Sequence, residues 1–306
     1  MRVVVTGATG FVGTGVVNEL LKQNTDVTVI VRNATQLPCY WNGKVTVIEA
    51  DLSSIHLLER ADFGKEKIDV FFHFAWSGTA GNERADVDLQ LNNVRYVCDA
   101  IALAKKLGCS RFINSGSIME YEAYQYLKED KAAPGMGYIY STAKLTGDFF
   151  ARICAKQADI EYINLIISNI YGVGEFSQRF LNSTLRKMMK NEPIDMTAGL
   201  QLYDFIYITD AAEAICMVAK CGEANSSYYI GNTCQRELRK FVLIMKEVVQ
   251  STSEIRFGAV PFTGAQLTYE EFDTAKIEQL GFTPKVSFEE GIRRTKEWIA
   301  ERENND

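Results

Sequence analysis

An apolar strand that runs directly into evenly spaced glycines is the feature that most restricts the fold of this 306-residue chain. Residues 3–5 are all valine, and Gly7, Gly10 and Gly13 follow in the spacing Gly-x-x-Gly-x-x-Gly. β-Branched residues favour a strand, while glycine permits a tight turn and lets a ligand approach the backbone closely. Apolar residues then recur at helical spacing over residues 12–21. The chain is therefore predicted to begin with a strand, a glycine turn and the N-terminus of a helix.

This turn is suited to binding an anion. Free backbone N–H groups and the positive end of the helix dipole face whatever occupies it. In a βαβ unit the usual occupant is the pyrophosphate of a dinucleotide. The alternative is a turn that merely joins a strand to a helix. The residues predicted to line the site are Gly7, Thr9, Gly10, Phe11, Val12 and Gly13.

Strand-like and helix-like stretches alternate along the first half of the chain. The strand-like runs are residues 3–6, 27–31, 45–48, 70–74, 112–114 and 162–167. Such alternation predicts an α/β fold with a doubly wound parallel sheet. After Gly172 the pattern loosens, and we expect a dinucleotide-binding domain over 1–170 and a smaller substrate lobe mainly within 171–306, with segments that return to the sheet. The helices expected there are 176–190, 210–220, 236–249, 273–280 and 288–301, with a short strand at 228–230.

A second pattern carries the residue types of an acid–base site. Tyr140 and Lys144 have the spacing Tyr-x-x-x-Lys, and Ser115-Gly116-Ser117 follows the strand predicted at 112–114. Residues four apart share one face of a helix, so the Tyr140 hydroxyl and the Lys144 ammonium can converge. A phenol has an ordinary pKa of about 10, and a nearby ammonium favours its ionised form. Alone, the spacing is more often an ordinary helix face, but together with the glycine turn it predicts proton transfer.

These motifs resemble those of the extended short-chain dehydrogenase/reductase family, which includes nucleotide-sugar epimerases, dehydratases and ketoreductases. The resemblance covers nearly the whole chain and includes the segments 168–172 and 203–210. It implies a Rossmann sheet with a smaller C-terminal substrate lobe. It also implies that Ser117, Tyr140 and Lys144 are catalytic, with Ser117 preferred to Ser115 because the family's downstream tyrosine then matches Tyr121.

The resemblance further implies which residues contact the ligands. The cofactor would be contacted by the glycine turn and by Asp51, Leu52, Phe74, Ala75, Trp76, Asn93, Tyr140, Lys144 and Ile167. The substrate would be contacted by Ser77, Ser117, Asn169, Arg179 and Tyr203. His73, at the end of a central strand, is interpreted as structural rather than catalytic.

The end of the second predicted strand indicates which cofactor is used. An acidic residue there usually holds the ribose 2′-hydroxyl of NAD. Here Val31 occupies that position and Arg32 follows it. A guanidinium can bind a 2′-phosphate through charge-assisted hydrogen bonds, so the sequence favours NADP(H), with NAD(H) still open. The alternatives are that Arg32 is a solvated charge, or that it stacks on adenine in an enzyme that takes either cofactor.

The residues after Ser117 bear on the reaction. Family dehydratases carry an Asp-Glu pair there, whereas Ile118 and Met119 cannot transfer protons, and Glu120 is offset and expected to point elsewhere. We predict NADPH-dependent reduction of the 4-keto group of a nucleotide-linked 4-keto-6-deoxy sugar. One alternative is a nucleotide-sugar 4-epimerase with tightly bound NAD. Another is a non-catalytic regulator that senses a dinucleotide, although an intact acid–base set argues against it.

The substrate end departs from the family pattern. Tyr203 stands where an arginine usually neutralises the diphosphate, and the segment 260–267 carries no charge. Arg179 or Arg236 could bind the anion instead, or either could be a solvated helix charge. Trp76, in the loop after the cofactor strand, could stack on a sugar or plug the cleft.

Composition excludes several other classes. A net charge of −6 and a pI of about 5.3 give no basic footprint for nucleic acid or an anionic membrane, and we expect no metal site because the chain has only 2 histidines. No apolar stretch reaches the roughly 20 residues of a membrane span. The early strand leaves no room for a signal peptide, and 7 cysteines without close pairs are typical of free thiols. We therefore expect a cytoplasmic enzyme.

Family members commonly form dimers through two helices, which here would be residues 86–107 and 138–156. We predict a homodimer. The apolar positions on these helices are Leu89, Val97, Ile101, Phe149, Phe150 and Ile153, some of which must face the sheet instead.

Overall fold

The computed structural model describes residues 1–128, 135–262, 267 and 269–303. Among these residues a seven-stranded sheet has the order β11-β6-β5-β4-β1-β2-β3, with every pair parallel. The strands are β1 (Arg2–Thr6), β2 (Asp26–Val31), β3 (Val45–Glu49), β4 (Val70–His73), β5 (Arg111–Ser115), β6 (Glu161–Ile167) and β11 (Ser226–Ile230). The order reverses beside β1, so the sheet is doubly wound. The predicted fold class is confirmed.

The central strands are apolar because both of their faces are covered. Val3 pairs with Val27 on one side and with Val70 on the other, and all three side chains are buried. Strands buried on both faces have continuous apolar runs rather than alternating ones. One core cluster lies under each face of the sheet. The valine run at the start of the chain thus lies in the centre of the sheet.

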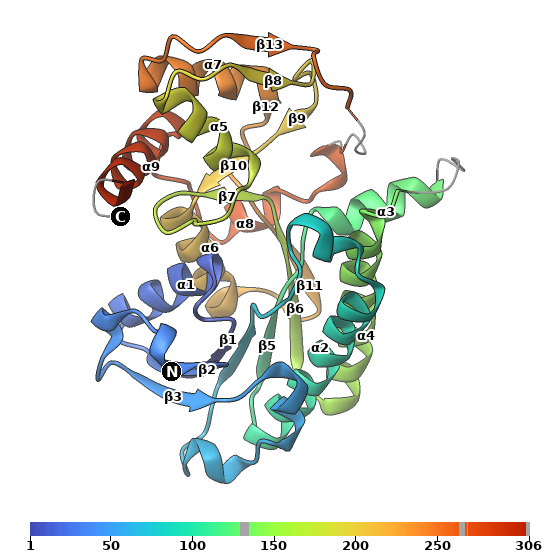
Figure 1. The fold of residues 1–306 in the computed structure, drawn as a ribbon. Coiled ribbons are helices and arrows are strands. Elements are labelled where there is room, and N and C mark those ends of the chain that lie inside the picture. Colours follow the sequence, from blue (N-terminus) through green and yellow to red (C-terminus); the bar gives the residue numbers. More distant parts are fainter. Residues whose placement is uncertain (129–134, 263–266, 268, 304–306) are drawn as a thin grey trace.

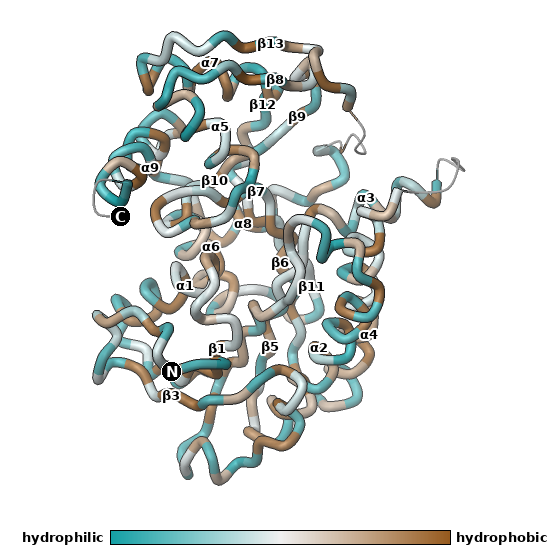
Figure 2. Tube along the Cα trace, viewed as in Figure 1, coloured by the Kyte–Doolittle hydropathy of each residue, from teal (hydrophilic) through white to brown (hydrophobic). Residues whose placement is uncertain are grey.

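Helices cover both faces of this sheet (Figure 1). α1 (Phe11–Lys22) packs with α6 (Ile208–Cys221) on one face, while α2 (Val87–Leu107) packs with α4 (Tyr138–Ala158) on the other. Figure 2 shows hydrophilic and hydrophobic residues mixed along α2 and α4, as expected of helices with one face on the core. The Asp86 carboxylate caps α2 by accepting a hydrogen bond from Leu89 N at 3.0 Å. α3 (Met119–Lys128), which no sequence pattern indicated, packs against α4.

The remaining elements form a smaller lobe above the carboxyl ends of the strands (Figure 1). Its short strand pairs are β7 with β10, β9 with β12 and β8 with β13. The strands are β7 (Asn169–Tyr171), β8 (Ile194–Met196), β9 (Leu202–Tyr203), β10 (Phe205–Tyr207), β12 (Arg236–Glu237) and β13 (Ile255–Phe257). The helices are α5 (Phe180–Met189), α7 (Leu238–Val249), α8 (Ala275–Gln279) and α9 (Phe288–Glu303).

Some predicted boundaries in this lobe are wrong. Residues 176–179 are not helical, because α5 begins only after Arg179, whose backbone is extended. Arg236 belongs to β12, where it pairs with Tyr203, rather than to the helix predicted at 236–249. The strand predicted at 228–230 is the end of β11, and it joins the main sheet beside β6. Among the described residues, none of the helices is both long and apolar enough to span a bilayer.

Candidate active site

The glycine turn between β1 and α1 forms a cradle into which no side chain fits. Gly7 has φ +70°, and a Cβ on it would lie 2.5 Å from Ala75 N. A Cβ on Gly13 would lie 2.1 Å from Gly7 O. Gly10, the N-cap of α1, has no side chain to satisfy the first N–H groups of the helix. These features fit the pyrophosphate of a dinucleotide, which needs close backbone approach and free donors.

The end of β2 presents a positive charge among carboxylates. Arg32 follows β2 and is exposed. Asp51 caps the 3₁₀ turn Leu52–Leu57, and hydrogen bonds from Ser53 lower the pKa of Asp51, with the charge of Arg32 acting in the same direction. Glu49 accepts a hydrogen bond from Ala34 N at 3.1 Å. Arg32 is therefore placed where it could meet a 2′-phosphate, with a second carboxylate nearby on β3.

The loop after β4 is fastened to α2 by two buried amide side chains. Asn93 accepts from Ser77 N at 3.0 Å and donates to Ser77 O at 2.8 Å. Gln90 Nε2 donates to Gly78 O at 3.0 Å and to Glu83 O at 3.1 Å. Asn93, which the resemblance implied as a cofactor contact, thus holds the backbone of this loop. These contacts also fix the path of the loop across the carboxyl end of the sheet.

Trp76 lies behind the predicted catalytic helix. Its Nε1 donates to Gln90 Oε1 at 2.9 Å, and its ring makes an edge contact with Tyr140 at 6.3 Å between centroids. Lys144 Nζ lies 3.8 Å from the centre of the same ring. Trp76 therefore packs between α2 and α4, in contact with Tyr140 and Lys144. This position favours the interpretation in which Trp76 plugs the cleft over the one in which it stacks on a sugar.

Ser117, Tyr140 and Lys144 meet at the carboxyl end of β5. The Ser117 side chain hydrogen-bonds with Tyr140, and Lys144 Nζ donates to Ser115 O at 2.8 Å. Burial lowers the pKa of Lys144. Burial also raises the pKa of Tyr140, while Arg84, the Ser117 hydrogen bond and Arg179 act in the opposite direction. The two arginines thus supply the positive charge that we expected from Lys144.

Arg84 is a candidate site residue that the motifs did not indicate. It belongs to the 3₁₀ turn Gly81–Ala85, and its guanidinium lies 4.5 Å from the centre of the Tyr140 ring. Its buried Nε has no hydrogen-bond partner among the residues that the structure describes. Arg179 lies beside the same loop after β4, and its Nη2 is 3.4 Å from Thr79 Oγ1. Together they could hold an anionic group of a substrate beside Tyr140. The sequence feature that could have indicated Arg84 is its position in the loop after β4.

Glu120 lies inside the protein, against the backbone of Ser117. It is only 3% exposed, and its Oε1 accepts a hydrogen bond from Ser117 N at 2.8 Å. Its Oε2 accepts from Asn164 Nδ2 at 3.0 Å. Glu120 N donates to Ser117 O at 3.1 Å, so a single turn over residues 117–120 brings Glu120 back beside Ser117. Both Glu120 oxygens are therefore bound by N–H groups of the protein.

The substrate lobe faces this site with few charges. Asn169 Nδ2 donates to Asp204 O at 3.1 Å, and Tyr203 stacks on Phe205 with 5.6 Å between ring centroids. A cavity of about 300 Å³ has Tyr203, Phe180, Leu238, Val260, Phe262, Thr197 and Gln201 among its lining residues. Arg236 is exposed and lies over Phe241, and the segment 260–267 falls partly outside the described residues. The lobe offers a mainly apolar pocket whose polar lining consists of amide and hydroxyl groups and the Asp195 carboxylate.

His73 is buried between two strands of the sheet. Its Nδ1 lies 2.8 Å from Thr6 Oγ1, and burial lowers its pKa to about 3. A neutral, enclosed imidazole fits the structural interpretation.

The fold and the site define a dinucleotide-binding α/β protein with a Ser, Tyr and Lys cluster at the carboxyl end of its sheet. The sequence matches the NAD dependent epimerase/dehydratase family over residues 3–231, and the chain belongs to that family.

The chain is similar over nearly its whole length to several known proteins. It is 27% identical over 300 residues to a CDP-abequose synthase of Salmonella muenchen, covering 96% of each chain. It is 26% identical over 308 residues to a putative UDP-glucose 4-epimerase of Methanocaldococcus jannaschii, covering 97% of this chain and 98% of that one. Among solved structures, a UDP-glucose 4-epimerase of Thermotoga maritima with UDP-glucose has a TM-score of 0.81, 19% identity and 100% coverage of both chains.

Proposed function

We propose that the protein is an NADPH-dependent reductase of the 4-keto group of a nucleotide-linked 4-keto-6-deoxy sugar. The observation that carries this proposal is the chemistry around Ser117. Ile118 and Met119, which follow it, carry no proton-transferring group, and both Glu120 oxygens accept hydrogen bonds inside the protein. Elimination of water has no acid–base pair at these positions, whereas carbonyl reduction needs only Ser117, Tyr140 and Lys144.

The substrate class is supported by the site and by the relatives. The names of the two relatives include a CDP-linked and a UDP-linked sugar. The apolar cavity beside Tyr203 could accept a nucleobase. Arg84 and Arg179 could hold an anionic group of the substrate. They would then take the role of the arginine that the family usually has at the position of Tyr203. The seven cysteines are free thiols, which supports the inferred cytoplasmic location.

Each residue of the site has its own role in the proposed reaction. The nicotinamide cofactor, when bound to the glycine cradle, supplies the hydride. The Ser117 hydroxyl donates a hydrogen bond to the substrate oxygen and stabilises the charge that develops there. Tyr140 gives its proton to the same oxygen. Lys144 would position the ribose of the bound cofactor and favour the ionised form of Tyr140.

A 4-epimerase is the second candidate, and it is favoured by the carboxylates around Arg32. The carboxylates of Glu49 and Asp51 lie near the end of β2, and they would repel a 2′-phosphate. Incubation with a panel of 4-keto and 4-hydroxy nucleotide sugars, followed by cofactor absorbance and product analysis, separates the two reactions. A reductase consumes NADPH with the ketone, and an epimerase interconverts C4 isomers with no net change in absorbance. A regulator would bind the dinucleotide and do neither.

Replacing Arg32 tests the choice of cofactor. We expect Arg32→Ala to weaken NADPH binding by about 1.5–3 kcal/mol, the range for hydrogen bonds to charged groups. NADH binding should change little, because the 2′-hydroxyl carries no charge. Titration calorimetry with both cofactors measures the difference. In the matched variant Glu49→Gln, NADPH binding should tighten instead. Equal weakening of both cofactors by Arg32→Ala would contradict an interaction with the 2′-phosphate.

The outer faces of α2 and α4 form the predicted interface of the homodimer. Leu91, Phe149, Phe150 and Ile153 are 50–59% exposed, whereas Val97 and Ile101 are buried against the sheet. We expect sedimentation to show a dimer at micromolar concentration and Phe150→Glu to give a monomer, because a charge would be buried in the interface. Leu243→Glu, at an exposed position on α7 of the smaller lobe, should remain dimeric. A wild-type protein that sediments only as a monomer would refute the prediction.

A further inference from the structure

The turn that carries Ser117 joins the end of β5 to the start of α3, and hydrogen bonds hold the residues on both sides of the serine. Before it, the carbonyl of Ser115 accepts from Lys144 Nζ at 2.8 Å. After it, Ile118 N donates to the carbonyl of Ile167, the last residue of β6, at 3.1 Å. The serine between these two points is held by its own set of bonds.

Glu120 binds both backbone polar groups of Ser117. Its Oε1 accepts from Ser117 N at 2.8 Å, and its own N–H donates to Ser117 O at 3.1 Å. The hydroxyl oxygen of Ser117 accepts from Met119 N at 3.1 Å. Because that bond uses one lone pair of the oxygen, the hydroxyl hydrogen is left for the side of Tyr140, with which Ser117 hydrogen-bonds. The contacts with Glu120 and Met119 thus set the direction of the hydroxyl.

The Glu120 carboxylate is itself fastened to the main sheet. Its Oε2 accepts from Asn164 Nδ2 on β6 at 3.0 Å, and Asn164 Oδ1 accepts from Asn114 Nδ2 on β5 at 2.9 Å. These three side chains are 3%, 0% and 4% exposed, respectively. Leaving a buried polar group without its partner is costly, so a satisfied network of this kind is rigid. The carboxylate therefore transmits the fixed position of two strands to Ser117.

Gly116 leaves the space that this carboxylate occupies. A Cβ at residue 116 would lie 2.6 Å from Glu120 Oε1 and 2.6 Å from both polar atoms of the Asn164 amide. A side chain there would push the carboxylate away from the backbone of Ser117. The glycine between the two serines is thus matched to the glutamate beneath the turn.

We propose that Glu120 is a positioning residue, which acts on the reaction through Ser117. The Ser117 hydroxyl stabilises the charge that develops on the substrate oxygen only if it already points at that oxygen. A misplacement of about 1 Å in such a group can slow a reaction roughly 10²-fold. Glu120 keeps the hydroxyl aimed without touching the reacting atoms itself. This inference rests on the role of Ser117 in the proposed reduction.

The test is a double-mutant cycle between residues 120 and 117, followed by NADPH oxidation with a 4-keto-6-deoxy nucleotide sugar. Glu120→Ala should lower kcat at least roughly 10-fold, because the hydroxyl can then turn away from the substrate oxygen. KM and the affinity for NADPH should change little. In an enzyme that already carries Ser117→Ala, Glu120→Ala should lower kcat by less than about twofold more, since no hydroxyl remains to be aimed.

Two further variants identify the bond that matters. Glu120→Gln keeps an oxygen for Ser117 N, and rotation of the Asn164 amide can provide an acceptor for the new NH₂ group. This variant should therefore retain most of the wild-type kcat. If the alanine variant does not fold, Glu120→Asp takes its place in the cycle, because a side chain one methylene shorter withdraws from Ser117 N.

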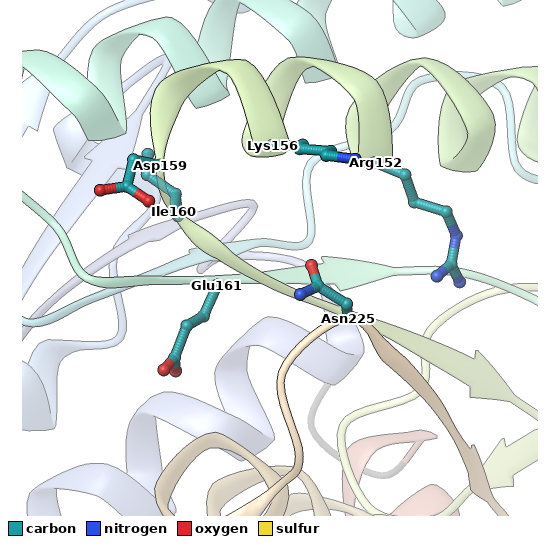
Figure 3. Close-up of a pocket in the computed structure, with 6 residues that line it drawn as sticks. All are labelled: Arg152, Lys156, Asp159, Ile160, Glu161 and Asn225. Carbon is teal, nitrogen blue, oxygen red and sulfur yellow. The ribbon is translucent and has the colours of Figure 1, made fainter.

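Asp148 provides the matched control. It is a buried carboxylate, and together with Glu120 it lines a cavity of about 200 Å³. Among the described residues, it accepts from Arg152 Nε at 2.9 Å and from the Tyr162 hydroxyl at 2.9 Å. Arg152 also lines a surface pocket of about 500 Å³ (Figure 3), so the bonds of Asp148 lead away from the turn. Asp148→Ala should lower the free energy of unfolding and leave kcat near the wild-type value.

Three results would overturn the positioning role. The first is a loss from Glu120→Ala by the same factor with and without the Ser117 hydroxyl, because the effect then does not pass through that group. The second is wild-type kcat in Glu120→Ala. The third is a Glu120→Gln enzyme as slow as the alanine variant, which would show that the bond to Ser117 N is not the cause.

Failure of the proposed function looks different. If Ser117→Ala alone keeps wild-type kcat, the role of Ser117 is wrong, and the positioning role fails with it. If the wild type interconverts C4 isomers without oxidising NADPH, the reductase proposal alone fails. The same cycle measured on that interconversion then decides the role of Glu120, because Ser117 would bind the same substrate oxygen.

Discussion

Tyr140→Phe should reduce the rate of 4-keto-sugar reduction by at least roughly 10²-fold, the lower range for a positioned proton donor. The substitution keeps the ring, which is 7% exposed and packs against Trp76 and under Arg84. It removes only the hydroxyl that hydrogen-bonds with Ser117. Stability and NADPH affinity should therefore change little, and the loss should appear in kcat. Steady-state kinetics together with thermal unfolding measure the two effects.

Tyr138→Phe is the control for this substitution. Tyr138 lies on the same helix, and its ring packs against Tyr126 with 5.2 Å between centroids. We expect nearly wild-type kcat in this variant. A Tyr140→Phe enzyme with wild-type kcat would show that another group protonates the substrate oxygen.

Ser117→Ala should cost up to about 3–4 kcal/mol of transition-state stabilisation, as in comparable oxyanion contacts. The Ser117 backbone is held by Glu120, so the turn should keep its shape without the hydroxyl. The hydroxyl also accepts a hydrogen bond from Met119 N at 3.1 Å, and its loss should lower stability only slightly. The expected signature is a large fall in kcat with a small change in the free energy of unfolding.

Ser115→Ala is the control for that result. Ser115 lies two residues earlier and is buried, and the variant keeps the carbonyl that accepts from Lys144. We expect it to retain most of the activity. If Ser115→Ala loses more activity than Ser117→Ala, the two serines exchange the roles assigned from the sequence.

The main sheet could be predicted because its central strands are continuous runs of apolar residues. The valines of β1 and the β-branched run of β2 are buried on both faces, so their composition alone indicates a strand. The glycine spacing predicted the turn, and the close approach of Gly13 to Gly7 O shows why alanine cannot replace it there. α3 was missed because it is a ten-residue helix that mixes charged and aromatic residues without a clear apolar stripe.

The candidate site was only partly predictable. Tyr140 and Lys144 follow a local helical rule, so their proximity could be deduced from spacing. Arg84 reaches Tyr140 because Gln90 folds the loop back onto α2, and no local pattern encodes that long-range contact. Glu120 was expected to point elsewhere because it is offset by one residue from the Asp-Glu pair of the family's dehydratases. Its contact with the Ser117 backbone depends on the turn over residues 117–120, which no sequence pattern indicated.

The reduction of a 4-keto-6-deoxy nucleotide sugar by NADPH carrying deuterium at C4 of the nicotinamide tests the central claim most directly. Product analysis by mass spectrometry and NMR gives both the stoichiometry and the position of the label. We predict one NADPH oxidised for each 4-hydroxy product, with deuterium bound to C4 of the sugar. Interconversion of C4 isomers with no NADPH consumed and no deuterium in the product would contradict the account.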